Sequence, residues 1–200
     1  MSRIVSGRAE NTDQVVVLPS SLEDPSKAPP GLYRVGLLAI CVSILAFFTA
    51  MVIAYLWRSH MPPYWTPIQL PKMLWVSTAL ILASSGTFEI GRRMFRRGEW
   101  RIASHLLLAT ASLGAGFLAA QVTAWRHLIA SGVFHAQNPH STFFYLFTGL
   151  HAAHLIGGMI AMAAVLFGRR KRRELIDVVC YYWHFLGILW VALYAVLLAA

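Results

Sequence analysis

Residues 143–159 read FFYLFTGLHAAHLIGGM, and residues 181–190 read YYWHFLGILW. Both stretches are apolar enough to lie in lipid, yet they carry His151, His154 and His184. A polar side chain inside a membrane is costly, and it is retained where it faces protein, water or a lipid head group. The two stretches therefore predict helices of a bundle with specific internal contacts, not a simple membrane anchor.

The composition excludes an ordinary soluble domain. Apolar residues make up 58% of the chain and charged residues 12%, about half of the roughly 25% charged residues of soluble proteins. The formal net charge is +9, but the basic residues lie in short blocks between apolar runs, which is a signal of membrane topology. We therefore expect no nucleic-acid partner.

Five apolar runs follow the polar N-terminal region, at about 33–57, 73–91, 102–125, 142–167 and 178–198. Each is near the ~20 residues that a helix needs to cross ~30 Å of hydrocarbon. The runs do not alternate, and an open sheet leaves backbone groups unsatisfied in lipid. We predict an all-α, polytopic membrane protein: a five-helix membrane bundle over residues 33–200, after a flexible cytoplasmic tail over residues 1–32.

The basic residues also predict the orientation of the helices. Fourteen of the 17 Lys and Arg residues lie in the N-terminal region and in the second and fourth loops, whereas Arg58, Lys72 and Arg126 lie in the first and third loops. Positively charged loops stay on the cytoplasmic side. The N-terminus is therefore expected in the cytoplasm and the C-terminus on the opposite, periplasmic side.

One carboxylate stands near the end of the second run. Arg92 and Arg93 follow Glu89 at i+3 and i+4, which are neighbouring positions on a helix surface. We predict an ion pair at the membrane interface, with His105 as an alternative partner of Glu89.

The cysteines, Cys41 and Cys180, show no metal-type spacing and are interpreted as small apolar side chains.

The histidines leave two hypotheses open. His151 and His154 are three residues apart and could ligate a metal or a haem, but no clustered Cys or Asp completes a zinc site. His184 could supply a second haem ligand, although it lies nearer the cytoplasmic end. We predict that His151 and His154 form hydrogen bonds between helices, and that His184 is a further structural donor near the membrane interface. A haem-binding electron-transfer protein is the alternative from another class.

Two helical stripes predict how the helices pack. Small residues at spacings of four are expected to allow close helix approach in lipid; they are Gly149, Ala153 and Gly157. On the last run, aromatic and small residues at spacings of 4, 3 and 4 predict a packing ridge; they are Trp183, Gly187, Trp190 and Tyr194.

Several segments together match a known family. They are Pro62-Pro63, residues 80–89 (LILASSGTFE), Gln121 with Trp125 and Gly132, and the two stretches quoted first. Over about residues 33–200 the chain resembles subunit III of haem–copper oxidases, the cytochrome c oxidase subunit III family, in its short five-helix form.

The resemblance implies an accessory, non-catalytic subunit of a bacterial terminal oxidase in the plasma membrane. It implies that this chain carries no catalytic residue, metal or cofactor, and that haem and copper lie in partner subunits. The implied partners are oxidase subunits I and II and membrane phospholipids. The chain would stabilise subunit I, bind phospholipid and support proton uptake while the complex reduces O2. Subunit III of a quinol oxidase or of a nitric-oxide-reductase-associated relative is the alternative.

The resemblance also assigns roles to individual residues. It implies that His151, His154 and His184 are structural, and that Trp183, His184 and Asp177 contact lipid or helix neighbours. A separate hypothesis rests on the density of arginines at the cytoplasmic face. We expect these arginines to bind lipid phosphates; they are Arg92, Arg93, Arg96 and Arg97.

The chain departs from the family at two positions that are typically acidic. Ile44 and Gly187 stand there instead, so a proton-related role of those side chains does not carry over.

Overall fold

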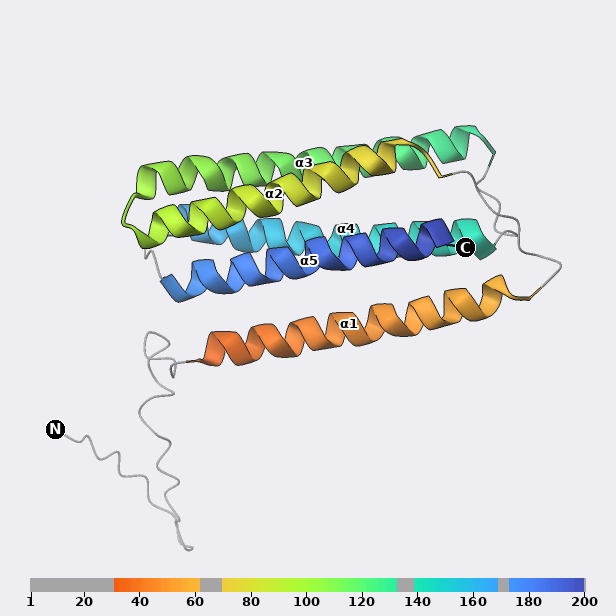
Figure 1. The fold of residues 1–200 in the computed structure, drawn as a ribbon, viewed down its shortest axis with the longest axis horizontal. Coiled ribbons are helices and arrows are strands. Elements are labelled where there is room, and N and C mark those ends of the chain that lie inside the picture. The colour runs from red at the N-terminus through yellow and green to blue at the C-terminus, as the bar shows by residue number, and fades with distance from the viewer. Residues whose placement is uncertain (1–30, 62–69, 133–138, 169–172, 200) are drawn as a thin grey trace, which may run out of the picture. The chain divides into compact units, whose positions relative to one another are not determined.

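The computed structural model describes residues 31–61, 70–132, 139–168 and 173–199. Within these ranges it contains helices and no strand (Figure 1). The helices are α1 (Leu32–Ser59), α2 (Met73–Arg96), α3 (Trp100–Ala130), α4 (Pro139–Phe167) and α5 (Arg173–Ala199). All five are long and apolar enough to cross a membrane. The prediction of an all-α protein with five membrane-spanning helices is confirmed.

Two helices differ from the predicted bounds in a way that matters for the site. The second helix continues to Arg96, and the fifth begins at Arg173, so the charged residues flanking the apolar runs are helical. Long arginine stems can cover apolar surface while their charged heads reach water, which lets a helix continue past its apolar segment. The predicted tail and Pro62-Pro63 lie outside the described residues, apart from Gly31 and Leu32.

Helices α2 to α5 form the core of the bundle. In Figure 1 α2 and α3 lie side by side as a hairpin, and α4 and α5 lie side by side beneath them. Contacts also join α2 to α5 and α3 to α4, so each of the four helices has two neighbours. The turn between α2 and α3 contains Gly98 with a φ of +87°, a conformation that glycine adopts without steric cost.

Helix α1 joins this core through long side chains. Its buried residues are Ile44, Phe48 and Tyr55, which lie on one face of the helix. The Tyr55 ring meets those of Phe143 and Phe147 on α4 at centroid distances of 5.5 and 5.6 Å. Most other apolar side chains of α1 are exposed. The helix therefore presents a broad apolar surface to lipid or to protein.

The two predicted stripes have different outcomes. The ridge on α5 is confirmed, because Trp183, Gly187, Trp190 and Tyr194 are all buried. The small-residue stripe on α4 does not pack against another helix of this chain at two of its positions, since Ala153 and Gly157 are exposed, and a Cβ on Gly157 would meet nothing within 4 Å. Glycines pack closely at other positions. Gly114 and Gly158 lie against the indole of Trp183, whereas Gly91 lies against Leu106 and Gly187 against Ser85.

Candidate functional sites

A charged cluster occupies the arginine-rich end of α2. Glu89 accepts two hydrogen bonds from Arg92, at 2.8 Å on Oε1 and 2.9 Å on Oε2, and a third from Nε of Arg93 at 2.9 Å on Oε1. Paired contacts between a guanidinium and a carboxylate are among the stronger hydrogen bonds of proteins. The predicted ion pair is confirmed. His105 is exposed and is not the partner of Glu89.

The same cluster links α2 to α5 through Asp177. Nη1 of Arg92 donates to Oδ1 of Asp177 at 3.2 Å, and Nη2 of Arg96 donates to Oδ2 at 2.7 Å. Arg92 thus bridges two carboxylates, and its side chain is 13% exposed. Asp177 contacts a neighbouring helix, as the resemblance implied. The exposed members of the arginine set are Arg93, Arg96 and Arg97, so these are the ones that can reach a lipid head group.

Two further side chains of α5 face Glu89. Sγ of Cys180 lies 3.4 Å from Nε2 of His184 and 3.8 Å from Oε2 of Glu89, and Nε2 of His184 lies 3.7 Å from the same oxygen. Cys180 and His184 are one helical turn apart, so they share a face of α5. Cys180 could not be predicted as part of a site, because its neighbour Glu89 is 91 residues away in the sequence.

Hydrogen bonds between helices at the middle of the bundle come from tryptophan. The indole N–H of Trp183 donates to Oγ of Ser84 at 3.0 Å, and that of Trp190 donates to Oγ1 of Thr78 at 3.0 Å. Gln121 similarly donates to Ser77 at 3.1 Å. These bonds connect α5 and α3 to α2. Such bonds were predicted at histidine, and the serines and threonines of α2 that accept them were not predicted.

His151 does not form the predicted interhelical hydrogen bond. Its ring is fully buried between α3 and α5, with centroids 5.7 Å from Phe117 and 5.2 Å from Trp190. Neither ring nitrogen has a hydrogen-bond partner within the described ranges, so the prediction is wrong for this residue.

His154 bonds within its own helix. Its Nδ1 lies 2.7 Å from the carbonyl oxygen of Leu150, and its ring meets that of Phe48 on α1 at 5.7 Å. The hydrogen bond that joins α4 to α5 at this position is made by the backbone of His154 and not by its imidazole. The Tyr182 hydroxyl donates to the His154 carbonyl oxygen at 3.3 Å.

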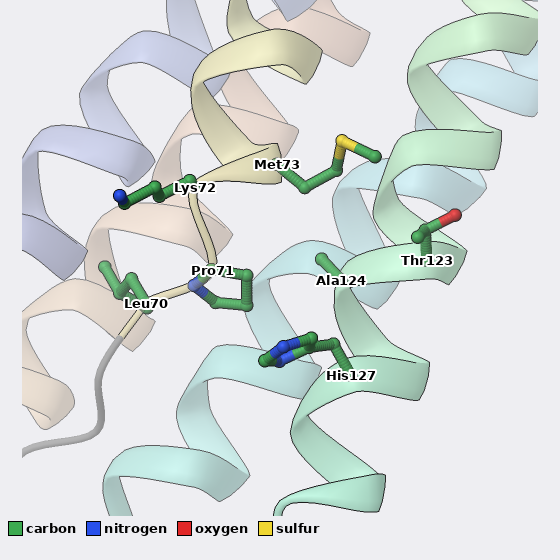
Figure 2. Close-up of a pocket in the computed structure, with 7 residues that line it drawn as sticks. All are labelled: Leu70, Pro71, Lys72, Met73, Thr123, Ala124 and His127. Carbon is green, nitrogen blue, oxygen red and sulfur yellow. The ribbon is translucent and has the colours of Figure 1, made fainter.

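Two hollows open on the surface of the bundle. An apolar groove of about 210 Å³ runs between α1 and α5; it is lined by Leu45, Phe48, Thr49, Val52, Leu189, Ala192, Leu193 and Val196. A more open hollow of about 500 Å³ lies between the start of α2 and the end of α3, as Figure 2 shows. Residues 70–73 line one side of it, and Thr123, Ala124 and His127 line the other. The first hollow has an almost wholly apolar lining, whereas Lys72 contributes a positive charge to the second.

A family model described as cytochrome c oxidase subunit III matches residues 27–199. The chain belongs to the cytochrome c oxidase subunit III family. It is therefore a multi-pass membrane subunit of a haem–copper oxidase and associates with other subunits of that enzyme. Membership agrees with the five spanning helices and with the resemblance that residues 80–89 and 143–158 carry.

Curated relatives extend the match over most of this subunit III. It is 30% identical over 177 residues to a probable cytochrome c oxidase subunit 3 of Nocardia farcinica, covering 83% of this chain and 87% of the relative. A probable cytochrome c oxidase subunit 3 of Mycobacterium leprae is 31% identical over 84% of this chain and 88% of its own length. The cytochrome c oxidase subunit 3 of Synechocystis is 26% identical over 82% and 74%.

Proposed function

We propose that the chain is the non-catalytic third subunit of a bacterial cytochrome c oxidase. In this role it stabilises catalytic subunit I, holds phospholipid against its own helices and supports proton uptake during O2 reduction. Haem and copper belong to the partner subunits, and subunit II is a further partner. The names of the relatives support cytochrome c as the electron donor of the complex.

The observation that carries the proposal is the apolar groove between α1 and α5. Seven of its eight lining residues are apolar, and Thr49 is the exception. The apolar lining of such a groove gains dispersion contacts from any apolar group that lies in it. In a bilayer an acyl chain fills such a space readily. A lipid held there would complete the packing of α1 and extend the flank that the subunit offers to its partners.

The arginine-rich end supports the head-group part of the proposal. The side chains of Arg93 and Arg96 are 66% and 50% exposed, and Arg97 is exposed beside them. Basic residues near an anionic leaflet contribute roughly 1 kcal/mol each. By the positive-inside rule this end faces the cytoplasm, the side from which an oxidase takes up protons. Lipid phosphates at these arginines would fix the subunit at that surface.

Purification of the tagged full chain in mild detergent tests the assembly. We expect haem–copper subunit I to copurify, with oxygen consumption supported by reduced cytochrome c. Consumption supported by a quinol and not by cytochrome c would favour the quinol-oxidase alternative. A Soret band on the isolated chain that disappears in His151→Ala or His154→Ala would instead favour a haem-binding electron-transfer protein.

A pair of alanine substitutions on α5 tests lipid binding. Ala192 lines the groove, whereas Ala195 is exposed on the same helix and is not among the lining residues. Ala192→Trp should lower the phospholipid retained by the purified complex in lipid mass spectrometry, and Ala195→Trp should leave it unchanged. Equal retention in both variants would contradict the assignment of the groove to lipid.

A further inference from the structure

Three potential metal-ligating atoms meet between α2 and α5. They are Oε2 of Glu89, Sγ of Cys180 and Nε2 of His184, and all lie within 4.8 Å of one another. We propose that these side chains form a binding site for a divalent metal ion of the zinc class. The site does not depend on the oxidase role proposed above, and it was not expected from the spacing of the cysteines.

The distances are near those of a zinc site. Zinc binds sulfur at about 2.3 Å and nitrogen or oxygen at about 2.0–2.2 Å, so tetrahedral geometry places a nitrogen and an oxygen donor roughly 3.3–3.5 Å apart and either of them roughly 3.5–3.7 Å from sulfur. The observed distances are 3.4 Å between sulfur and nitrogen, 3.7 Å between nitrogen and oxygen, and 3.8 Å between sulfur and oxygen. A tetrahedral ion would lie about 0.7 Å out of the plane of the three donors and about 2.2 Å from each, so shifts of a few tenths of an ångström would complete the bonds. The fourth position stays open for water.

The donor set is one that zinc prefers. Thiolate and imidazole are ligands of borderline-soft ions, and a carboxylate completes many zinc sites. A thiolate and a carboxylate together balance the charge of a divalent ion, and binding would release the thiol proton of Cys180. Cys180 is buried, whereas the side chains of Glu89 and His184 are 24% and 31% exposed. An ion can therefore approach from the exposed side of the cluster.

The neighbouring ion pairs orient the carboxylate rather than block it. Oε1 of Glu89 accepts from both Arg92 and Arg93, and Oε2 accepts from Nε of Arg92 at 2.9 Å. Oε2 also accepts a long bond from the Cys180 thiol at 3.8 Å, which is lost when metal binding releases the thiol proton. A carboxylate oxygen has two lone pairs, so Oε2 retains one for the metal. Hydrogen bonds of this kind hold ligands in position at metal sites. Asp177 offsets the positive charge of Arg92 and Arg96 close by.

Cobalt provides a direct readout. Co²⁺ is added to the untagged full chain in detergent micelles, because a polyhistidine tag would itself bind metal. A bond between thiolate and Co²⁺ gives a near-ultraviolet charge-transfer band that oxygen and nitrogen ligands do not give. The chain has two cysteines, so Cys41→Ser leaves Cys180 as the sole thiol. We expect the band in the wild type and in Cys41→Ser, and its removal by excess Zn²⁺.

Two further variants locate the site. Cys180→Ser should abolish the band, and His184→Gln should weaken Co²⁺ binding at least about tenfold, with helix content checked by circular dichroism. If Cys180→Ser fails to fold, Cys41→Ser and the Zn²⁺ competition still decide the question. Absence of the band in folded Cys41→Ser would show that the thiol merely hydrogen-bonds Glu89 and would overturn the proposal. A band that persists in folded Cys180→Ser would overturn it equally.

Discussion

Replacing Gly114 by alanine tests how tightly Trp183 is packed. A Cβ on Gly114 would lie 2.9 Å from Cη2 and 3.0 Å from Cζ2 of the indole. Carbon atoms in contact prefer about 3.5–4.0 Å, so the ring or the helix must move by roughly 0.5–1 Å. The indole cannot swing freely, because its N–H is bonded to Ser84. Overpacking of this kind costs about 1–3 kcal/mol.

Gly116→Ala on the same helix is the matched control. Its Cβ would meet Cδ1 of Leu80 at 3.6 Å, an ordinary contact. Both substitutions gain about 0.5–1 kcal/mol from the lower flexibility of alanine in a helix, so their difference isolates the clash. We expect Gly114→Ala to be less stable by about 1–3 kcal/mol. In a chain of this size each kcal/mol shifts the thermal midpoint by about 2–4 °C.

The assay is thermal unfolding of the full chain in detergent, combined with a double-mutant cycle. Trp183→Phe removes the six-membered ring of the indole, to which Cη2 and Cζ2 belong, so Gly114→Ala should cost less in that background. The coupling energy for residues in contact is about 0.5–3 kcal/mol. Equal midpoints for Gly114→Ala and Gly116→Ala, or an unchanged cost in Trp183→Phe, would refute the reasoning.

Three further tests, two of them with a control variant, probe the remaining contacts. Glu89→Gln should lower the free energy of unfolding by about 1–3 kcal/mol, because it weakens charged hydrogen bonds to Arg92. Arg93→Gln, which removes an exposed ion pair, should lower it by less than about 1 kcal/mol. Chemical unfolding measures both free energies. Tyr55→Ala should speed hydrogen exchange in α1 by removing a buried ring, and Trp57→Ala, at a side chain that is 70% exposed, should not. Trp190→Phe should cost more than the ~0.6 kcal/mol average for an interhelical hydrogen bond in a membrane, because it also leaves a cavity at a fully buried site, and an unshifted midpoint would contradict that bond.

The lipid environment explains why the five helices are predictable from the sequence. A spanning segment must satisfy its backbone internally, so length and hydropathy alone indicate a helix at each of the five runs. The pair between Glu89 and Arg92 was predictable for a similar local reason, because positions three apart on a helix are neighbours. Such rules act within one helix and need no knowledge of its partners.

Contacts between helices were less predictable. Asp177 reaches Arg92 across 85 residues, and nothing in the spacing indicates that pairing. The glycines on α4 show the same limit, since Gly157 and Gly158 are adjacent in sequence but only the second is buried. A rotation of one residue turns a side chain by about 100° around a helix. In lipid both faces are apolar, so hydropathy does not reveal which one meets protein.

The placement of polar groups follows the cost of charge in a membrane. Charged side chains are expensive at the bilayer centre and less so towards the interface. The cluster of Glu89, Arg92 and Asp177 accordingly lies at helix ends, whereas neutral bonds from Trp183 and Trp190 join the helices further in. The neutral bonds fix the register of α5 on α2, and this register places Cys180 and His184 beside Glu89. The geometry of the proposed metal site is therefore set by packing that requires no metal.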